Sequence, residues 1–171
     1  MTGSKFDPER LFQTLNRHAV AYVVVGGMAA VAHGSTLPTE DVDITPARDR
    51  DNLDRLGAAL RELNARIRTD NEPDGVAFRC DGAFIATQPV MLNLITDVGD
   101  VDLTLAPTGF PTGYEELVIR SVVIDVGDGA ETRIAALDDV IASKRAAGRN
   151  KDIAALPYLD ALAEEIDAEG G

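Results

Sequence analysis

The sequence is poor in aromatic and sulfur-containing residues, with no tryptophan and a single cysteine among 171 residues. Because Cys80 has no second cysteine to pair with, an intramolecular disulfide is excluded, and a small buried hydrophobe is its simplest interpretation. The aromatic residues show no stacking pattern of the kind that binds single-stranded nucleic acid. His18 and His33 are too few and too dispersed for a His-ligated metal site. Neither G-x-G-x-x-G nor G-x-x-x-x-G-K-[ST] occurs, which disfavours a Rossmann or P-loop protein.

Basic residues are also scarce, since 16 Lys and Arg face 29 Asp and Glu and the formal net charge is −13. Nonspecific binding of nucleic acid depends mainly on neutralising phosphates, so any nucleic-acid contact must be local. The longest apolar run, residues 19–32, is broken by two glycines and is too short to cross a bilayer, and the N-terminus lacks the apolar core of a signal peptide. We therefore expect a cytoplasmic protein with no membrane partner.

The length and the 45% hydrophobic content suit a single domain that spans residues 1–171. We expect a core of about residues 20–135 and a C-terminal helical part of about residues 136–168. The expected helices are residues 6–18, 28–33, 52–64, 137–147 and 153–166, with Gly148 as a C-cap and Pro157 in the first turns of the last helix. The expected strands are residues 22–25, 42–45, 76–79, 91–96, 101–105, 118–126 and 131–134.

A diglycine corner follows the first apolar strand, where Gly26 and Gly27 come directly after Tyr22–Val25. Glycine lets the backbone approach a ligand closely, and the first amides of a following helix have no internal partner and carry its positive dipole end. A tight turn is the ordinary explanation of two glycines seen alone. Followed by a helix and then by paired carboxylates, the corner instead predicts a binding site for phosphate. Ser35, in the loop beyond, is a candidate phosphate contact or a turn residue.

Two carboxylates lie on the second predicted strand, in Asp41-Val42-Asp43. Residues two apart project from the same side of a strand, so Asp41 and Asp43 point together while Val42 and Ile44 point into the protein. A solvated strand face is the alternative explanation. Convergent carboxylates beside a phosphate site suit magnesium, which takes oxygen ligands and fills its other positions with water and substrate phosphates.

A third acid would complete a site for two metal ions, in which one ion activates an attacking hydroxyl and the other steadies the leaving pyrophosphate. The stretch from Asp100 to Thr104 repeats the pattern of residues 41–45, and Asp102 lies between Val101 and Leu103. Asp102 is our choice for the third carboxylate, with Asp100 as the alternative. It would bind the first metal ion and help to remove the proton of the acceptor.

The one dense basic cluster comprises Lys144, Arg145, Arg149 and Lys151. A solvated helix face is its plain interpretation. The cluster lies next to another carboxylate, Asp152, which instead favours a role for these cations in binding a triphosphate.

These motifs resemble the nucleotidyltransferase superfamily with the DNA polymerase beta-like fold, and within it the bacterial AbiEii and MenT toxins, over about residues 22–159. The resemblance implies an α+β fold with a mixed sheet flanked by helices and with C-terminal helices. It implies a nucleoside triphosphate, two Mg2+ ions, transfer of a nucleotidyl group to a hydroxyl, and in some toxins the 3′ end of tRNA as acceptor and a cognate antitoxin. By this resemblance Gly26 and Gly27 bind phosphate, Asp41, Asp43 and Asp102 are catalytic metal ligands, Lys144 and Lys151 neutralise phosphate, Arg149 assists, and Asp152 orients a lysine.

Two other functions remain open at the level of sequence. The same chemistry on a small-molecule acceptor, as in aminoglycoside-modifying relatives, fits the acidic balance because cationic compounds are drawn to acidic clefts. A nucleotidyltransferase fold kept as a noncatalytic binding or regulatory module is the third hypothesis, against which the intact carboxylates argue.

Overall fold

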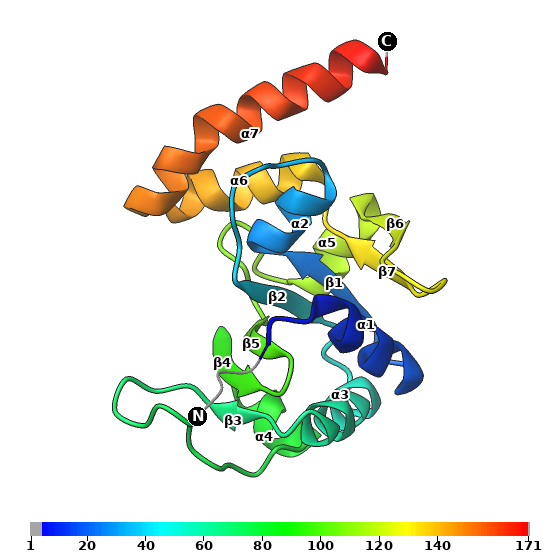
Figure 1. Ribbon diagram of the computed structural model, residues 1–171, viewed down its shortest axis with the longest axis vertical. Coiled ribbons are helices and arrows are strands. Elements are labelled where there is room, and N and C mark those ends of the chain that lie inside the picture. The colour runs from blue at the N-terminus through cyan, green and yellow to red at the C-terminus, as the bar shows by residue number, and fades with distance from the viewer. Residues whose placement is uncertain (1–4, 171) are drawn as a thin grey trace.

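The computed structural model describes residues 5–170, in which a seven-stranded sheet is flanked by helices (Figure 1). The strand order is β3-β4-β5-β2-β1-β7-β6. Two strand pairs, β1 with β7 and β2 with β5, are parallel, and the other four are antiparallel. In chain order the elements are α1 (Pro8–Arg17), β1 (Tyr22–Val25), α2 (Gly26–Ala32), β2 (Asp41–Pro46), α3 (Arg50–Glu62), β3 (Arg66–Ile67), α4 (Gly82–Ala86), β4 (Met91–Thr96), β5 (Gly99–Thr104), α5 (Tyr114–Arg120), β6 (Val122–Asp125), β7 (Glu131–Ile134), α6 (Leu137–Ala147) and α7 (Asn150–Glu169).

The core lies between the central strands and the helices that cover them. All four residues of β1 are buried, as a short continuous apolar run predicts for a central strand. On α3, Leu53, Leu56 and Leu60 are fully buried, which confirms the helical spacing of these leucines. Asp49 begins this helix by accepting a hydrogen bond from the Asn52 backbone N–H.

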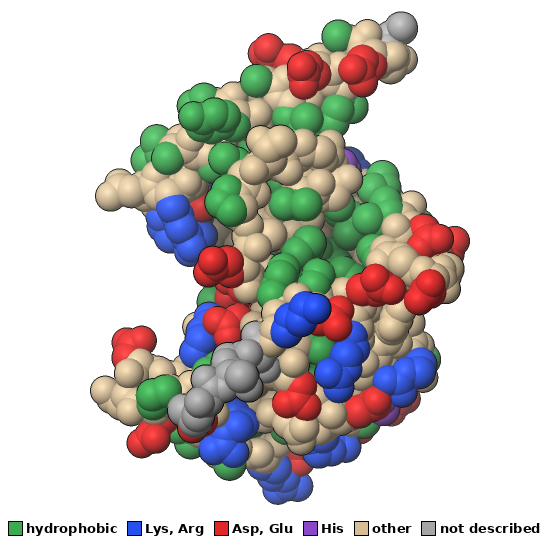
Figure 2. Space-filling model, viewed as in Figure 1, with side chains coloured by type: hydrophobic (Ala, Val, Ile, Leu, Met, Phe, Trp, Pro, Cys, Tyr) green, Lys and Arg blue, Asp and Glu red, His purple; other side chains and the backbone are tan. Residues whose placement is uncertain are grey.

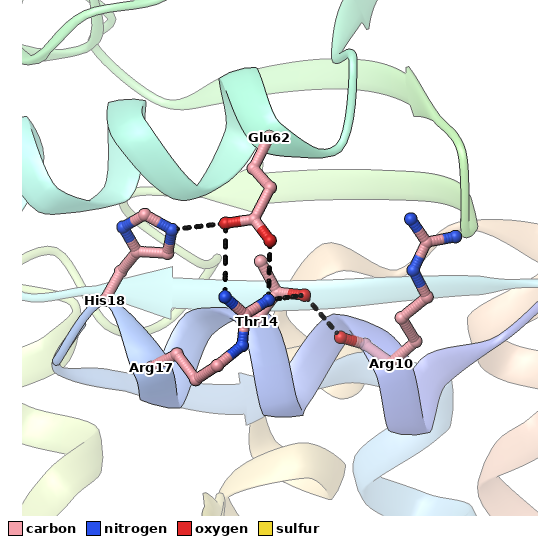
Figure 3. A network of polar contacts seen from close by, with 5 residues as sticks. All are labelled: Arg10, Thr14, Arg17, His18 and Glu62. Atoms are coloured by element: carbon pink, nitrogen blue, oxygen red, sulfur yellow. Dashed lines mark hydrogen bonds and ion pairs between the residues drawn. The ribbon is translucent and has the colours of Figure 1, made fainter.

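Helices α1 and α3 are joined by a polar network around Glu62 (Figure 3). Arg17 Nη2 donates to Glu62 Oε1 at 2.6 Å, and His18 Nε2 lies 2.6 Å from Glu62 Oε2. Hydrogen bonds from Arg17 and His18 lower the pKa of Glu62 to about 2. The network ties the N-terminal helix to the body of the molecule at a place remote from the cleft described below.

The predicted strand over residues 118–126 is wrong in its first half, because helix α5 ends only at Arg120. β-Branched Val118 and Ile119 suggest a strand, but the segment is set by what precedes it. Gly113, at φ 61°, turns the chain into the helix, and the Thr112 backbone N–H donates to the side chain of Glu116 at 2.9 Å. Leu117 then anchors the helix in the core, so tertiary packing overrides strand propensity.

The predicted strand over residues 76–79 is also wrong. Only Val76 forms a bridge, to Ile67, and the segment that follows is irregular up to Asp81. Asp81 then caps the short helix α4 by accepting from the Phe84 backbone N–H at 2.9 Å, an element that the sequence analysis did not predict.

Helices α2 and α7 begin earlier in the chain than predicted. Helix α2 includes both glycines of the corner, and α7 begins at Asn150, so Pro157 lies inside α7 instead of in its first turn or two. Gly148 adopts the left-handed conformation at the end of α6, which confirms it as the C-cap. Helix α7 projects from the body at the top of Figure 1. Within residues 5–170, none of the helices combines the length and apolarity that a bilayer span requires.

Candidate active site

A cleft of about 1240 Å³ runs between the sheet and the two C-terminal helices. Figure 2 shows the molecule hollowed on its left side, with acidic and basic side chains at the margin of the hollow. All ten of the residues that the sequence analysis selected line this cleft: Gly26, Gly27, Ser35, Asp41, Asp43, Asp102, Lys144, Arg149, Lys151 and Asp152. Residues far apart in the chain are therefore brought to one concavity.

The three carboxylates converge because β2 and β5 are parallel neighbours in register. Asp41 is aligned with Asp100, and Asp43 with Asp102. Side chains at aligned positions of neighbouring strands project from the same face. One carboxylate oxygen from each of Asp41, Asp43 and Asp102 lies within 4.8 Å of the others. Three hard oxygen donors at this spacing fit a divalent cation such as Mg2+.

The glycine corner lies directly against this cluster. Gly26 has a φ of +65°, and an added Cβ atom would lie 2.2 Å from Asp43 Oδ2. Glycine is thus required at this position both for its backbone conformation and for the close approach of the carboxylate. A Cβ atom at Gly27 would meet Thr39 Oγ1 at 3.1 Å, which is a milder contact. The backbone N–H groups that begin α2 donate to no side-chain cap.

The electrostatics of the cluster also favour a bound cation. Burial raises the pKa of Asp43 to about 7, and repulsion from Asp41 and Asp102 adds to the effect. Burial likewise raises the pKa of Asp102, although attraction to Arg68 opposes the shift. Negative charge is therefore costly at this site in the protein alone, and a metal ion would relieve that cost.

Arg68 is a residue of the site that the sequence analysis missed. Its Nη2 atom donates to Asp102 Oδ1 at 2.9 Å, and its Nη1 atom lies 3.2 Å from Asp100 Oδ2. The backbone N–H of Arg68 donates to the carbonyl of Asn93, the residue of β4 aligned with Asp102. No local pattern marks this arginine, because the strand order β3-β4-β5 is what carries it to the carboxylates.

The three basic residues that line the cleft from the C-terminal segment, Lys144, Arg149 and Lys151, divide into two groups. Asp152 is fully buried and binds Arg149 Nε at 2.7 Å and Lys144 Nζ at 3.6 Å. Burial disfavours its ionised form, but Arg149 and Lys144 outweigh that effect and lower the pKa of Asp152. Lys151 has no ion pair with any described residue, and its charge acts on Asp43. Lys144 and Arg149 are thus paired with Asp152 at the corner between α6 and α7, whereas Lys151 is not paired with a described carboxylate.

Ser35 lies in the cleft wall, where its hydroxyl oxygen accepts a backbone hydrogen bond. The Leu37 backbone N–H donates to Ser35 Oγ at 3.2 Å, which is the turn role weighed for this residue.

Comparison with known proteins identifies the fold of the chain. No protein-family model matches the chain, and no curated protein matches it in sequence. The crystal structure of TM1012 from Thermotoga maritima, a candidate nucleotidyltransferase, is similar with a TM-score of 0.55 at 15% identity, over 90% of this chain and 93% of its own. The antibiotic-resistance factor ANT(2'')-Ia, known from a solution structure, gives a TM-score of 0.52 at 13% identity, over 95% of this chain and 90% of its own. This chain therefore has the nucleotidyltransferase fold, and the predicted fold class is confirmed.

Proposed function

We propose that this protein is a magnesium-dependent nucleotidyltransferase that transfers a nucleotidyl group from a nucleoside triphosphate to a hydroxyl. The observation that carries the proposal is the convergence of Asp41, Asp43 and Asp102 within 4.8 Å, directly beside the glycine corner. The nucleotidyltransferase fold supports it. A structural role alone does not require three carboxylates to be brought this close together, because their mutual repulsion costs stability.

Each group of residues has a separate task in this reaction. Asp41, Asp43 and Asp102 would hold two Mg2+ ions, which when bound activate the acceptor hydroxyl and neutralise the charge that develops on pyrophosphate. The acceptor oxygen attacks the α-phosphorus, the bond from that phosphorus to the β-bridging oxygen breaks, and pyrophosphate leaves. Asp102, the carboxylate held by Arg68, accepts the proton of the hydroxyl.

The triphosphate is bound where the glycine corner lies against the carboxylate cluster. Gly26 and Gly27 let the β- and γ-phosphates approach the backbone at the start of α2. Lys151 lines the same cleft from α7 and supplies positive charge to the phosphates. Its ammonium is available because no described carboxylate forms an ion pair with it, Asp152 being paired with Lys144 and Arg149. Lys144 and Arg149 assist through Asp152, which keeps the N-terminal turn of α7 in place over the cleft.

Two classes of acceptor fit this site. A small cationic acceptor is favoured by Glu40 and Asp100, carboxylates that line the cleft in addition to the triad, and by the net charge of −13. An antibiotic-resistance factor among the structural neighbours is consistent with it. The alternative is the 3′ end of tRNA, modified by a toxin with a cognate antitoxin, which rests on the resemblance to AbiEii and MenT toxins.

The test is a transfer assay with each α-32P nucleoside triphosphate, Mg2+, and either total tRNA or an aminoglycoside panel. We expect label in one acceptor class, equimolar pyrophosphate release, and a loss of at least about 100-fold in Asp43→Asn. Asp160→Asn removes an exposed carboxylate on α7 and is the matched control. If Asp43→Asn labels the acceptor as fast as wild type, the site assignment is wrong. If calorimetry finds no Mg2+-dependent binding of any triphosphate, the noncatalytic module becomes the better account.

A further inference from the structure

We propose that Arg68 is an internal counter-ion of the carboxylate cluster, which holds Asp102 in place and competes with the metal ion for its negative charge. This inference rests on the proposed function, because it assigns to one residue the control of that same site. It concerns the affinity for metal and can be tested without turnover.

The contacts of Arg68 are directed at the cluster and at little else. Its guanidinium forms ion pairs with Asp102 at 2.9 Å and with Asp100 at 3.2 Å. Asp102 is nearly buried, with 10% of its side chain exposed, and the Arg68 side chain is 29% exposed. The contact with Asp102 is a charge-assisted hydrogen bond, whereas Nη1 forms only an ion pair with Asp100, whose side chain is 44% exposed. The pair with Asp102 is therefore the stronger and more specific of the two.

Among the described residues, Arg68 is the only cation within 4.0 Å of any carboxylate of β2 or β5. Lys151 acts on Asp43 from a greater distance, and Arg149 and Lys144 are engaged by Asp152. Without Arg68, four acidic side chains on two adjacent strands would face one another with no close counter-charge. Arg68 therefore supplies, in the metal-free protein, part of the neutralisation that Mg2+ supplies when bound.

The position of Arg68 also fixes the geometry of the third acid. Its backbone N–H is bonded to Asn93 on β4, and β4 is paired with β5 at Asp102, so the arginine is anchored to the strand next to its partner. One oxygen of Asp102 is thus committed to Arg68. Arg68 is accordingly a positioning residue, which acts on the reaction through Asp102.

Two opposite effects on metal affinity separate this proposal from a merely structural role. If Arg68 only holds the fold together, its loss loosens the cluster and weakens metal binding. If Arg68 competes with the metal, its loss removes a positive charge next to the site and strengthens binding, by roughly tenfold for a monovalent charge at this range. The sign of the change is therefore diagnostic.

The experiment is a titration of the intact protein with Mn2+ as the probe, followed by electron paramagnetic resonance of the free ion, at neutral pH and low salt. We expect Arg68→Gln to bind Mn2+ roughly tenfold more tightly than wild type. Arg68→Lys should lie between the two, because a compact ammonium can pair with one carboxylate at a time. Arg66→Gln is the matched control: it removes the same charge two residues earlier, on β3, where the side chain bonds only backbone carbonyls of Asp74 and Gly75.

Thermal melting is the second measurement, and it shows whether the variant still folds. Arg68→Gln should melt at a lower temperature than wild type in chelator and should gain more from added Mg2+. If Arg68→Gln does not fold, Arg68→Lys still gives the sign. An affinity that is unchanged or weaker in both variants overturns the inference and leaves the proposed function intact. Absence of Mn2+ binding in wild type would overturn the metal site itself.

Discussion

The carboxylate of Asp43 lies so close to the Cα atom of Gly26 that a Cβ atom on this glycine would fall 2.2 Å from Asp43 Oδ2. Gly26 follows β1 and begins α2, and Asp43 lies on β2, opposite Val25 in the antiparallel ladder. The phosphate corner and the metal cluster are therefore parts of one compact structure. A change in either must disturb the other.

Gly26→Ala should abolish Mg2+-dependent triphosphate binding and lower the free energy of unfolding. The left-handed conformation alone costs a non-glycine residue about 1–2 kcal/mol, and displacement of Asp43 adds to this. The control is Gly129→Ala, at φ +75° with nothing within 4 Å of the added Cβ atom, which bears the backbone strain without the contact. Calorimetric titration and urea unfolding check both variants. Equal triphosphate binding by the two would contradict the account.

Asp43→Asn should stabilise the metal-free protein at high pH. The folded-state pKa of Asp43, about 7, is above its ordinary value of 3.8, so its stabilising contribution is complete below 3.8 and is lost as pH rises through 7. Asp43→Asn does not lose stability in this way. The difference in free energy of unfolding between variant and wild type should therefore grow from pH 4 to 7, to on the order of 2–4 kcal/mol, and then level off. Melting curves in chelator between pH 4 and 9 measure it. An advantage that does not change with pH would show that Asp43 is ionised normally.

Asp152→Asn should be one of the most destabilising single changes in the C-terminal helices. It leaves Arg149, with 60% of its side chain exposed, and Lys144, with 21% exposed, without their buried partner. Water can solvate these cations, so we expect a cost below the roughly 3–5 kcal/mol of breaking a fully buried pair. Asp160→Asn breaks the exposed pair with Arg145 and should cost no more than about 1 kcal/mol. Hydrogen exchange should show faster exchange at the start of α7 in the first variant. Comparable stability of the two variants would refute the role given to Asp152.

Glu62→Gln should lower the melting temperature slightly at neutral pH, because it weakens the contacts of α3 with Arg17 and His18. The folded-state pKa of Glu62 is about 2, below the ordinary 4.5, so the contribution is present above pH 4.5 and is lost as pH falls toward 2. Added salt should reduce the difference between variant and wild type, since these groups are exposed. Metal binding should not change. A Glu62→Gln variant that alters Mn2+ affinity would show that the network is coupled to the cleft.

The parts of the site that sequence could predict are those set by local geometry. The two-residue period of a strand predicts that Asp41 and Asp43 project together, and the repeated pattern at Asp100–Thr104 predicts a second strand of the same kind. The parallel register that aligns Asp43 with Asp102 then brings the third carboxylate to the pair.

The parts that sequence could not predict depend on tertiary order. Arg68 reaches Asp102 only because β4 lies between β3 and β5, and a single arginine in a polar segment carries no sign of that order. Helix α5 likewise carries Val118 and Ile119, whose strand propensity is overridden by the turn at Gly113 and the burial of Leu117. The two roles of the basic residues also became distinct only when Asp152 was found buried between Arg149 and Lys144.

The most direct test of the central claim is a crystal structure of the protein with Mg2+ and a nonhydrolysable nucleoside triphosphate. The account predicts Mg2+ bound by Asp41, Asp43 and Asp102, the phosphate chain at Gly26 and Gly27, and the Lys151 ammonium within ion-pair distance of a phosphate oxygen. A triphosphate bound elsewhere, or bound in this cleft with no metal ion at the three carboxylates, would contradict it.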